Sequence, residues 1–394
     1  MKKMSGILSV LLAVVLVIGV FSACGNTAPA APAETAAPAA EAPASEAPVS
    51  EAPADEAPAQ TRTVTDALGR SVELPAVVEK IVPLGNTPRM ITYLGLADKV
   101  VGLGGMDRDS ITPLTAYAYA NKDLWYDLPI VGTDSMGNTN YYPEDIMKCA
   151  PDVVLCTYTE DIVNDLEAKT GIPVVAVGQG NLFGADYDEA LVILGEACGV
   201  PERAEEVVAY IHALLDDLDA RTRDIKDEDK PTVLSAAATF KGAHGIEGVR
   251  LVDSVLDAIH ANNVAASAAV GGGTNAEVDR EQILAWNPDY IFCDYGGVKL
   301  VKQDMADDPD FYSQLKAFSE GHLYQHPSST SYFSNLEVPL VNCYFIGSVI
   351  YPEQFADVDI EAKASEIYDF FLGDPDFNAK LEEYGASYSV ITAD

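Results

Sequence analysis

Short apolar runs alternate with longer amphipathic stretches along most of the chain. Runs rich in Val, Ile and Leu between amphipathic segments are typical of buried parallel strands connected by helices. The pattern therefore predicts an α/β fold with parallel sheets. The candidate strands are residues 80–84, 100–103, 153–157, 174–177, 233–238 and 290–293.

One amphipathic segment, residues 201–225, is much longer than the others. Its apolar residues, among them Val207, Ile211 and Leu218, recur at helical spacing, and charged residues occupy the other positions. Acidic residues and Pro231 follow it. We therefore expect one long helix in the middle of the chain, connecting two halves.

The two halves share a sequence block. Residues 144–156 match residues 281–293 without gaps, and Glu, Ile, Pro, Asp and Cys recur in register. Each copy is consistent with a short helix, a Pro-Asp turn and a buried strand. The simplest fold that explains this repeat is two similar α/β lobes joined by one long helix.

The N-terminus has the features of an export signal. Lys2 and Lys3 precede an apolar stretch at residues 7–20, and Ser22, Ala23 and Cys24 follow shortly after it. This ending resembles a bacterial lipobox, which predicts that Cys24 is lipidated; the alternative is an ordinary secretory signal. The stretch that follows, rich in Ala, Pro and Glu, cannot bury enough apolar surface to fold. The expected organisation is 1–24 signal peptide, 25–60 disordered tether, 61–200 N-terminal lobe, 201–226 linking helix and 227–394 C-terminal lobe.

Composition narrows the function. The chain carries 61 acidic and 24 basic side chains, a formal net charge of −37. Such a surface repels nucleic acid, so nucleic acid is excluded as a partner. Apart from Cys24, the five cysteines show no CxxC pair, which favours free buried thiols over a disulfide framework or a zinc site.

Several markers recur along the chain, at residues 65–72, 79–82, 97–102, 128–132, the two repeated blocks, and residues 351–355. In this order and spacing they resemble the family of binding proteins that deliver iron–siderophore complexes, haem and cobalamin to type II ABC importers. The resemblance covers nearly all of residues 61–394. It implies two Rossmann-like α/β lobes joined by one long rigid helix, with a ligand cleft between the lobes. It implies a monomeric, lipid-anchored protein on the outer face of the cell membrane, with an ABC permease and its ATPase as partners. It implies no cofactor of its own; the ligand is an iron complex or a related metal chelate, and oxyanions remain open.

In this family, loops at the carboxyl ends of the strands contact the ligand, as expected for open α/β sheets. Arg and Lys would pair with anionic groups of a chelate, and tyrosines would supply flat apolar area. The candidate ligand-binding residues are Asn86, Arg89, Met106, Arg108, Tyr158, Lys241, His244, Tyr295 and Tyr332.

His244 lies in a Gly-rich loop, where a neutral imidazole could ligate a metal or donate a hydrogen bond to a chelate. We expect its loop to face Asn86 and Arg89 across the cleft, because both loops follow the first strand of their lobe.

Glu144 and Glu281 recur in the repeated blocks. As first-turn acids they would favour the helix dipole. The resemblance implies more, because one glutamate per lobe meets arginines of the permease in related proteins.

Signals of catalysis are weak: the chain has no GxSxG elbow and no P-loop. We therefore expect a binding protein and no enzyme. The alternatives are a surface lipoprotein enzyme or a ligand sensor that uses the same cleft.

Overall fold

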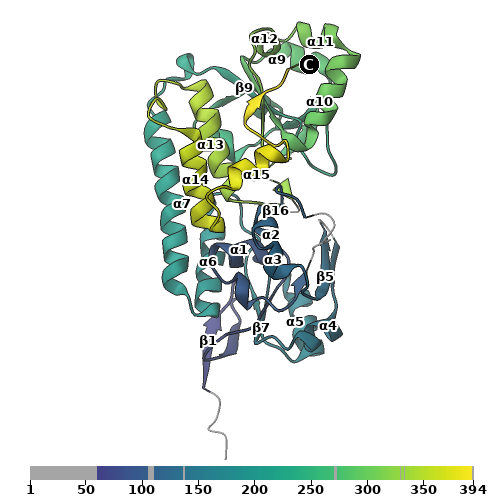
Figure 1. Cartoon of the computed structure of the whole chain (residues 1–394), viewed down its shortest axis with the longest axis vertical. Helices are drawn as coiled ribbons and strands as arrows, with labels where there is room; N and C mark the ends of the chain where they lie inside the picture. Colours follow the sequence, from purple (N-terminus) through teal and green to yellow (C-terminus); the bar gives the residue numbers. More distant parts are fainter. Residues whose placement is uncertain are drawn as a thin grey trace, which may run out of the picture. The chain divides into compact units, whose positions relative to one another are not determined.

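Two α/β lobes, each built around a mainly parallel sheet, form the described part of the chain (Figure 1). The structure is a computed structural model that describes residues 60–104, 111–135, 138–269, 273–328, 330–331 and 333–392. These residues belong to the larger of two compact units, Ala57–Asp394. The expected signal peptide, Cys24 and nearly all of the expected tether lie outside the described residues, as do Met106, Arg108 and Tyr332.

The N-terminal lobe, defined here as β1 to α6, contains a parallel sheet in the order β3-β7-β8 and a second sheet in the order β4-β5-β6. A β1-β2 hairpin precedes them. Its strands are β1 (Thr61–Thr65), β2 (Ser71–Pro75), β3 (Ile81–Pro83), β4 (Leu103–Gly104), β5 (Ile130–Ser135), β6 (Asn138–Tyr141), β7 (Val153–Cys156) and β8 (Val174–Ala176). Its α-helices are α1 (Thr87–Tyr93), α2 (Ala116–Ala120), α3 (Lys122–Trp125), α4 (Pro143–Cys149), α5 (Glu160–Thr170) and α6 (Ala185–Cys198).

The C-terminal lobe, defined as β9 to β17, has a sheet in the order β11-β9-β13-β14-β17, in which only β17 is antiparallel to its neighbour. Its strands are β9 (Thr232–Ala236), β10 (Gly248–Arg250), β11 (Asn262–Asn263), β12 (Asn275–Glu277), β13 (Tyr290–Asp294), β14 (Leu323–His326), β15 (Thr330–Ser331), β16 (Phe333–Ser334) and β17 (Ser389–Val390). Its α-helices are α8 (Ser254–Ala258), α9 (Arg280–Trp286), α10 (Tyr295–Asp307), α11 (Pro309–Ser313), α12 (Lys316–Ser319), α13 (Glu337–Ile350), α14 (Ile360–Leu372) and α15 (Phe377–Glu383).

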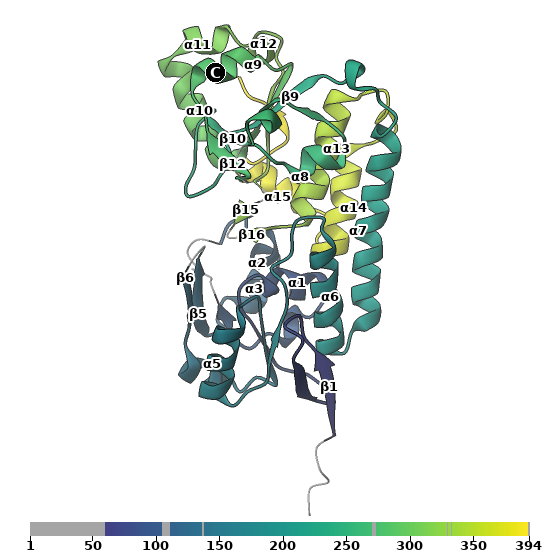
Figure 2. The same cartoon turned by 180° about the vertical axis from the view of Figure 1, so that it is seen from behind.

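The long helix α7 (Pro201–Thr222) joins the lobes, as its amphipathic pattern predicts. Proline at its start loses no helical hydrogen bond, because the first N–H groups of a helix have no partner within it. Helices α13 and α14 run beside α7 in both views (Figures 1 and 2). The Tyr344 hydroxyl of α13 donates to Asp217 of α7 at 2.8 Å, and the rings of Tyr210 (α7) and Phe370 (α14) stack at 3.9 Å.

One hydrophobic core extends through these helices into both lobes. It includes Leu155 of β7, Leu218 of α7, Tyr344 of α13 and Phe292 of β13, all buried. Because close-packed interiors resist deformation, this shared core supports the expectation of a rigid linkage.

The repeated sequence blocks adopt the same structure. In each lobe a short helix ends in a left-handed residue, Ala150 or Asn287, and a Pro-Asp turn leads into a buried strand. The Asp152 carboxylate accepts the backbone N–H of Lys80 just before β3, at 2.9 Å. Asp289 accepts that of Thr232 in β9, at 2.7 Å. The repeated Asp therefore ties the strand of each block, β7 or β13, to its neighbour in the sheet, β3 or β9, and the two-lobed α/β fold is confirmed.

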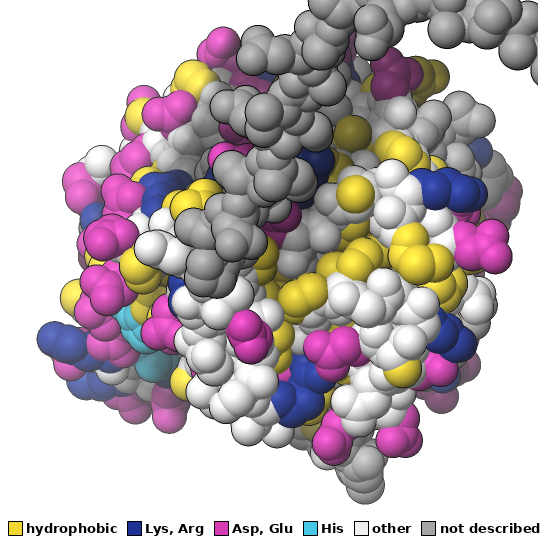
Figure 3. Space-filling view, turned by 90° about the horizontal axis from the view of Figure 1, so that it is seen from below, with side chains coloured by type: hydrophobic (Ala, Val, Ile, Leu, Met, Phe, Trp, Pro, Cys, Tyr) yellow, Lys and Arg dark blue, Asp and Glu magenta, His cyan; other side chains and the backbone are white. Residues whose placement is uncertain are grey.

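The surface is acidic, in keeping with the net charge of −37. On the face seen from below, acidic side chains are distributed among basic and hydrophobic ones (Figure 3). The five cysteines of the described residues are free, and all but Cys149 are buried. Among the described residues, no helix is both long and apolar enough to span a membrane.

Candidate functional site

A polar pocket of about 170 Å³ lies at the carboxyl-end edge of the C-terminal sheet. Its polar side chains include Arg250 at the end of β10, His326 at the end of β14 and Asn342 of α13. Leu182, from the loop that follows β8 in the N-terminal lobe, forms part of its wall, so both lobes contribute to it. The remaining lining residues are Val252, Asp253, Ser254, Val255, Thr274 and Ile346.

Arg250 is held in place by a buried carboxylate. Its Nη2 lies 3.2 Å from Oδ2 of Asp294, whose side chain is 1% exposed. The other oxygen of Asp294 accepts the backbone N–H of Gly296 at 2.9 Å and so caps α10. A fixed guanidinium in a pocket is suited to bind carboxylate or oxyanion groups of a ligand.

His326 is buried, with 6% of its surface exposed, and this burial lowers the pKa of its imidazole, which is therefore neutral at neutral pH. Its Nδ1 lies 2.9 Å from the carbonyl of Pro327 and 3.1 Å from Nδ2 of Asn342. The amide oxygen of Asn342 accepts from the Tyr388 hydroxyl at 2.9 Å, which orients the amide nitrogen toward His326.

The sequence analysis missed Arg250, His326 and Asn342 as site residues. His326 is the last residue of β14, whose sequence Leu-Tyr-Gln-His is too short and polar to stand out as a buried strand. Had this strand been recognised, the rule that ligands bind at the carboxyl ends of strands would have pointed to His326. Asn342 lies within a helix, and nothing in its local sequence indicates that it faces the pocket.

In the N-terminal lobe, Asn86 links the carboxyl ends of three strands. Its backbone N–H donates to Oγ1 of Thr157, and its side-chain amide donates to the carbonyl of Gln179 at 2.7 Å. The backbone at Gly85 passes so close to Thr157 that a Cβ at this position would lie 2.3 Å from the threonine hydroxyl. Asn86 is 2% exposed.

Arg89 is 0% exposed. Its Nη1 donates to Oδ1 of Asn86 at 2.5 Å, its Nε donates to Oδ1 of Asn335 at 3.2 Å, and the guanidinium lies 4.4 Å from the ring centre of Tyr117. The structure thus brings together Asn86 and Arg89, but in a buried cluster with Asn335.

The other candidates that the structure describes lie on elements outside this cluster. Tyr158 is 8% exposed and follows β7. Tyr295 begins α10, donates to the carbonyl of Tyr384 at 3.0 Å, and has its pKa raised by burial.

Lys241 is exposed, with a left-handed φ of 51°. Nε2 of His244 lies 2.8 Å from the carbonyl of Phe240, and the two rings stack at 4.1 Å. The residues that line the pocket of Arg250 do not include His244. Within the described ranges, no three His, Cys, Asp or Glu side chains gather as a metal site. Ligand contact by these candidates, and metal ligation by His244, stay predictions.

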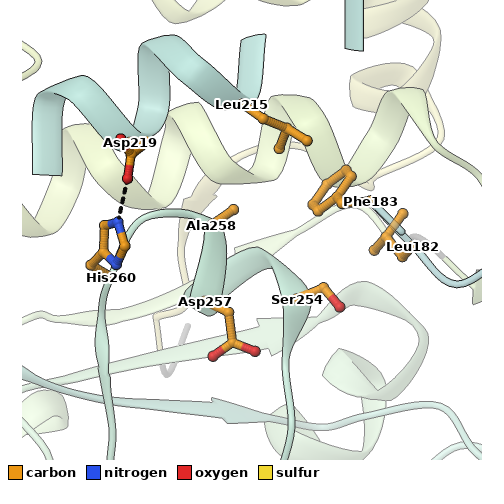
Figure 4. A pocket seen from close by; sticks show the side chains of 8 residues that line it. All are labelled: Leu182, Phe183, Leu215, Asp219, Ser254, Asp257, Ala258 and His260. Carbon is orange, nitrogen blue, oxygen red and sulfur yellow. Dashed lines mark hydrogen bonds and ion pairs between the residues drawn. The ribbon is translucent and has the colours of Figure 1, made fainter. Parts of the chain in front are cut away.

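A second pocket of about 380 Å³ adjoins the first, and the two share Leu182 and Ser254 as lining residues. Figure 4 shows the apolar side chains of Leu182, Phe183 and Leu215 along one part of it. In another part, Nε2 of His260 pairs with Asp219 of α7 at 2.9 Å. This second pocket lies where the linking helix α7, the loop after β8 and helix α8 meet.

Glu144 and Glu281 are exposed and lie in the first turns of α4 and α9. Glu144 borders a surface hollow, together with Tyr142 and Met147, which are 39% and 43% exposed. Exposed apolar area beside an acid is a feature of interaction surfaces.

Comparison with known proteins gives consistent results. Residues 86–330 match the family model described as periplasmic binding protein. The chain is 25% identical, over 66% of its length and 77% of the relative's, to the uncharacterized ABC transporter substrate-binding lipoprotein YvrC of Bacillus subtilis.

Solved structures share the fold. A periplasmic solute binding protein from Veillonella parvula aligns with a TM-score of 0.64 at 21% identity, covering 80% of this chain and 93% of that one. The molybdate periplasmic binding protein MolA of Haemophilus influenzae aligns with a TM-score of 0.60 at 20% identity, covering 79% and 98%. The chain therefore belongs to the periplasmic binding protein family, the substrate-binding proteins that work with the permease and ATPase of ABC importers.

Proposed function

We propose that this substrate-binding protein captures an anionic metal chelate, such as an iron–siderophore complex or a related complex, and delivers it to its permease. The observation that carries the proposal is the pocket of Arg250, His326 and Asn342 at the carboxyl-end edge of the C-terminal sheet, closed on one side by Leu182. Ligand sites of open α/β sheets lie at such edges.

The chemistry of the pocket supports a ligand of this kind. Arg250 offers a guanidinium whose position is set by Asp294, and Thr274 and Ser254 add hydroxyl groups. A neutral imidazole at His326 can hydrogen-bond a chelate without repelling its metal. Because the whole chain is strongly acidic, a cationic group inside a pocket would select an anion that the outer surface repels.

The size of the pocket favours a second candidate, a small oxyanion. Its volume of about 170 Å³ is below the range of roughly 300–1,000 Å³ usual for larger organic ligands. MolA, which has the same fold, is described as a molybdate binding protein. A chelate would need the adjoining pocket as well, whereas an oxyanion would fit beside Arg250 alone.

We further propose that a lipid on Cys24 anchors the protein to the outer face of the membrane and that residues 25–60 serve as the tether. The lipobox-like ending of the signal and the description of YvrC as a lipoprotein support this assignment.

Docking on the permease is assigned to Glu144 and Glu281. They are exposed, occupy equivalent positions in the repeated blocks, and lie one on each lobe. Two acids placed in this way would meet two basic partners only when the lobes have the correct separation.

The test is to purify the protein natively and identify any co-purifying compound by absorbance and mass spectrometry. Titration with a ferric siderophore, haem, cobalamin and molybdate follows. Saturable binding of a metal chelate supports the main proposal, and binding of molybdate alone supports the oxyanion. Failure of all four probes, with no compound found, would contradict both.

A further inference from the structure

Helix α13 connects the ligand pocket to a buried anchor in the other lobe. Asn342 and Ile346 of this helix line the pocket. Its first residue, Glu337, lies five positions before Asn342, about 7.5 Å along the axis at 1.5 Å per residue. Because Glu337 and Asn342 are so close within one helix, a displacement of Glu337 would move Asn342 by nearly the same amount.

The anchor is a pair of contacts between α13 and α1 of the N-terminal lobe. The Tyr93 hydroxyl donates to Oε2 of Glu337 at 2.5 Å and accepts the backbone N–H of Leu336 at 3.1 Å. Tyr93 and Glu337 are both 0% exposed. One phenol therefore holds both the backbone and the first side chain of the helix start.

Arg89 holds the residue before this start. Its Nε donates to Asn335, which is 0% exposed and donates in turn to the carbonyl of Leu114 at 3.0 Å. With its guanidinium shielded from solvent, Arg89 is better placed to fix Asn335 than to meet a ligand.

The far end of this connection is equally constrained. Asn342 reaches His326 at 3.1 Å and the carbonyl of Pro327 at 3.3 Å. A rotation of α13, or a translation along its axis, would move Asn342 away from these groups. Their contacts would then weaken, because hydrogen bonds depend steeply on distance and angle.

We propose that Tyr93 and Arg89 are positioning residues of the ligand pocket: through Glu337 and Asn335 they fix the setting of α13, which places Asn342 against His326. The inference rests on the proposed function for the identity of the pocket as the ligand site. It assigns Arg89 an indirect role in place of the direct ligand contact expected from its position in the sequence.

The test compares Tyr93→Phe with Tyr312→Phe in the purified chain without ligand. Tyr312 is a matched control, because its buried hydroxyl also donates to a carboxylate, that of Asp304 at 2.9 Å, within the C-terminal lobe. Each variant loses its hydrogen bond to a carboxylate, and Tyr93→Phe also loses the acceptor of the Leu336 N–H, so both should lower Tm. Only Tyr93→Phe should shift the ring ¹⁵N signals of His326, assigned with His326→Gln, and move its protonation midpoint toward that of ordinary histidine.

A second variant, Asn335→Ala, cuts the contact with Arg89 and should produce the same His326 change, which keeps the test valid if Tyr93→Phe does not fold. Unchanged His326 signals in a folded variant would overturn the proposal, as would an equal change in Tyr312→Phe. Because no ligand is used, this result is independent of whether chelates or molybdate bind, so failure of the proposed function is recognised separately.

Discussion

The Tyr93 hydroxyl and the Glu337 carboxylate form a 2.5 Å hydrogen bond between α1 and α13 with neither side chain exposed. The other oxygen of Glu337, Oε1, is buried and has no hydrogen-bond partner among the described residues. Burial raises the pKa of Glu337, and the hydrogen bond from Tyr93 and the nearby charge of Arg89 oppose this only in part. The fold therefore favours the protonated acid.

Glu337→Gln should stabilise the protein at pH 8 by a few degrees in Tm and have little effect at pH 4. A carboxyl with a raised folded-state pKa contributes stability below its ordinary pKa, and that contribution is lost as pH rises through the raised value. Glutamine keeps the acceptor for Tyr93 without the charge. Thermal unfolding followed by circular dichroism measures the effect, with exposed Glu144→Gln as the control. A lower Tm for Glu337→Gln at pH 8 would show that the buried group is needed as an anion.

Arg250→Ala should weaken binding of an anionic ligand by about 10- to 100-fold, since a hydrogen bond to a charged group contributes roughly 1.5–3 kcal/mol. Isothermal titration measures the affinity. Arg280→Ala is the control, because Arg280 belongs to the same lobe and pairs there with Glu247 and Asp308 at 2.8 and 2.7 Å. It should lower Tm without changing affinity; equal affinity in both variants would remove Arg250 from the site.

His244→Ala should weaken binding by about 1–3 kcal/mol if the imidazole donates to a charged ligand, and should change the visible spectrum of a bound metal complex if it ligates the metal. His212→Ala, which removes an exposed imidazole of α7 that pairs with Asp188 of α6, is the control. A wild-type affinity and spectrum in His244→Ala would leave this residue with only its contacts to Phe240.

Charge reversal at Glu144 or Glu281 should impair uptake and permease association while ligand affinity stays unchanged. Loss of one partner of an interfacial charge pair costs about 2–5 kcal/mol when the other charge is left buried. Uptake in cells and pull-down of the permease measure the effect, with exposed Glu228→Lys as the control. A matching loss of ligand affinity would place the two glutamates in the binding site.

Cys24→Ala should remove the acyl mass and move the protein from the membrane fraction to the soluble fraction, with an unchanged circular dichroism spectrum. Mass spectrometry and cell fractionation decide the outcome. Retention in the membrane without the acyl group would contradict the lipid anchor.

Local sequence was sufficient for the lobes. The repeated Pro-Asp turn specifies the same contact twice, through Asp152 and Asp289, and each contact involves a strand whose apolar run is visible in the sequence. The amphipathic pattern likewise locates α7.

The buried polar cluster could not be predicted in this way. Arg89 and its partner Asn335 are 246 positions apart, and a lone Arg after a strand has the same local pattern whether it faces ligand or core. The burial of Arg89 depends on where α13 begins, which is decided by tertiary packing.

The packing of the C-terminal helices also bears on how the chain reaches its native state. Tyr93 and Tyr119 of the N-terminal lobe pack edge-on against Phe371 and Phe377, at 5.1 and 6.1 Å between ring centres. These phenylalanines belong to α14 and α15, which follow the linking helix α7 in the sequence, so an emerging N-terminal lobe lacks part of its core until both helices have been synthesised. Domains with complete cores fold as soon as they are made. This one stays incomplete, which suits a chain that an export signal would direct across the membrane unfolded.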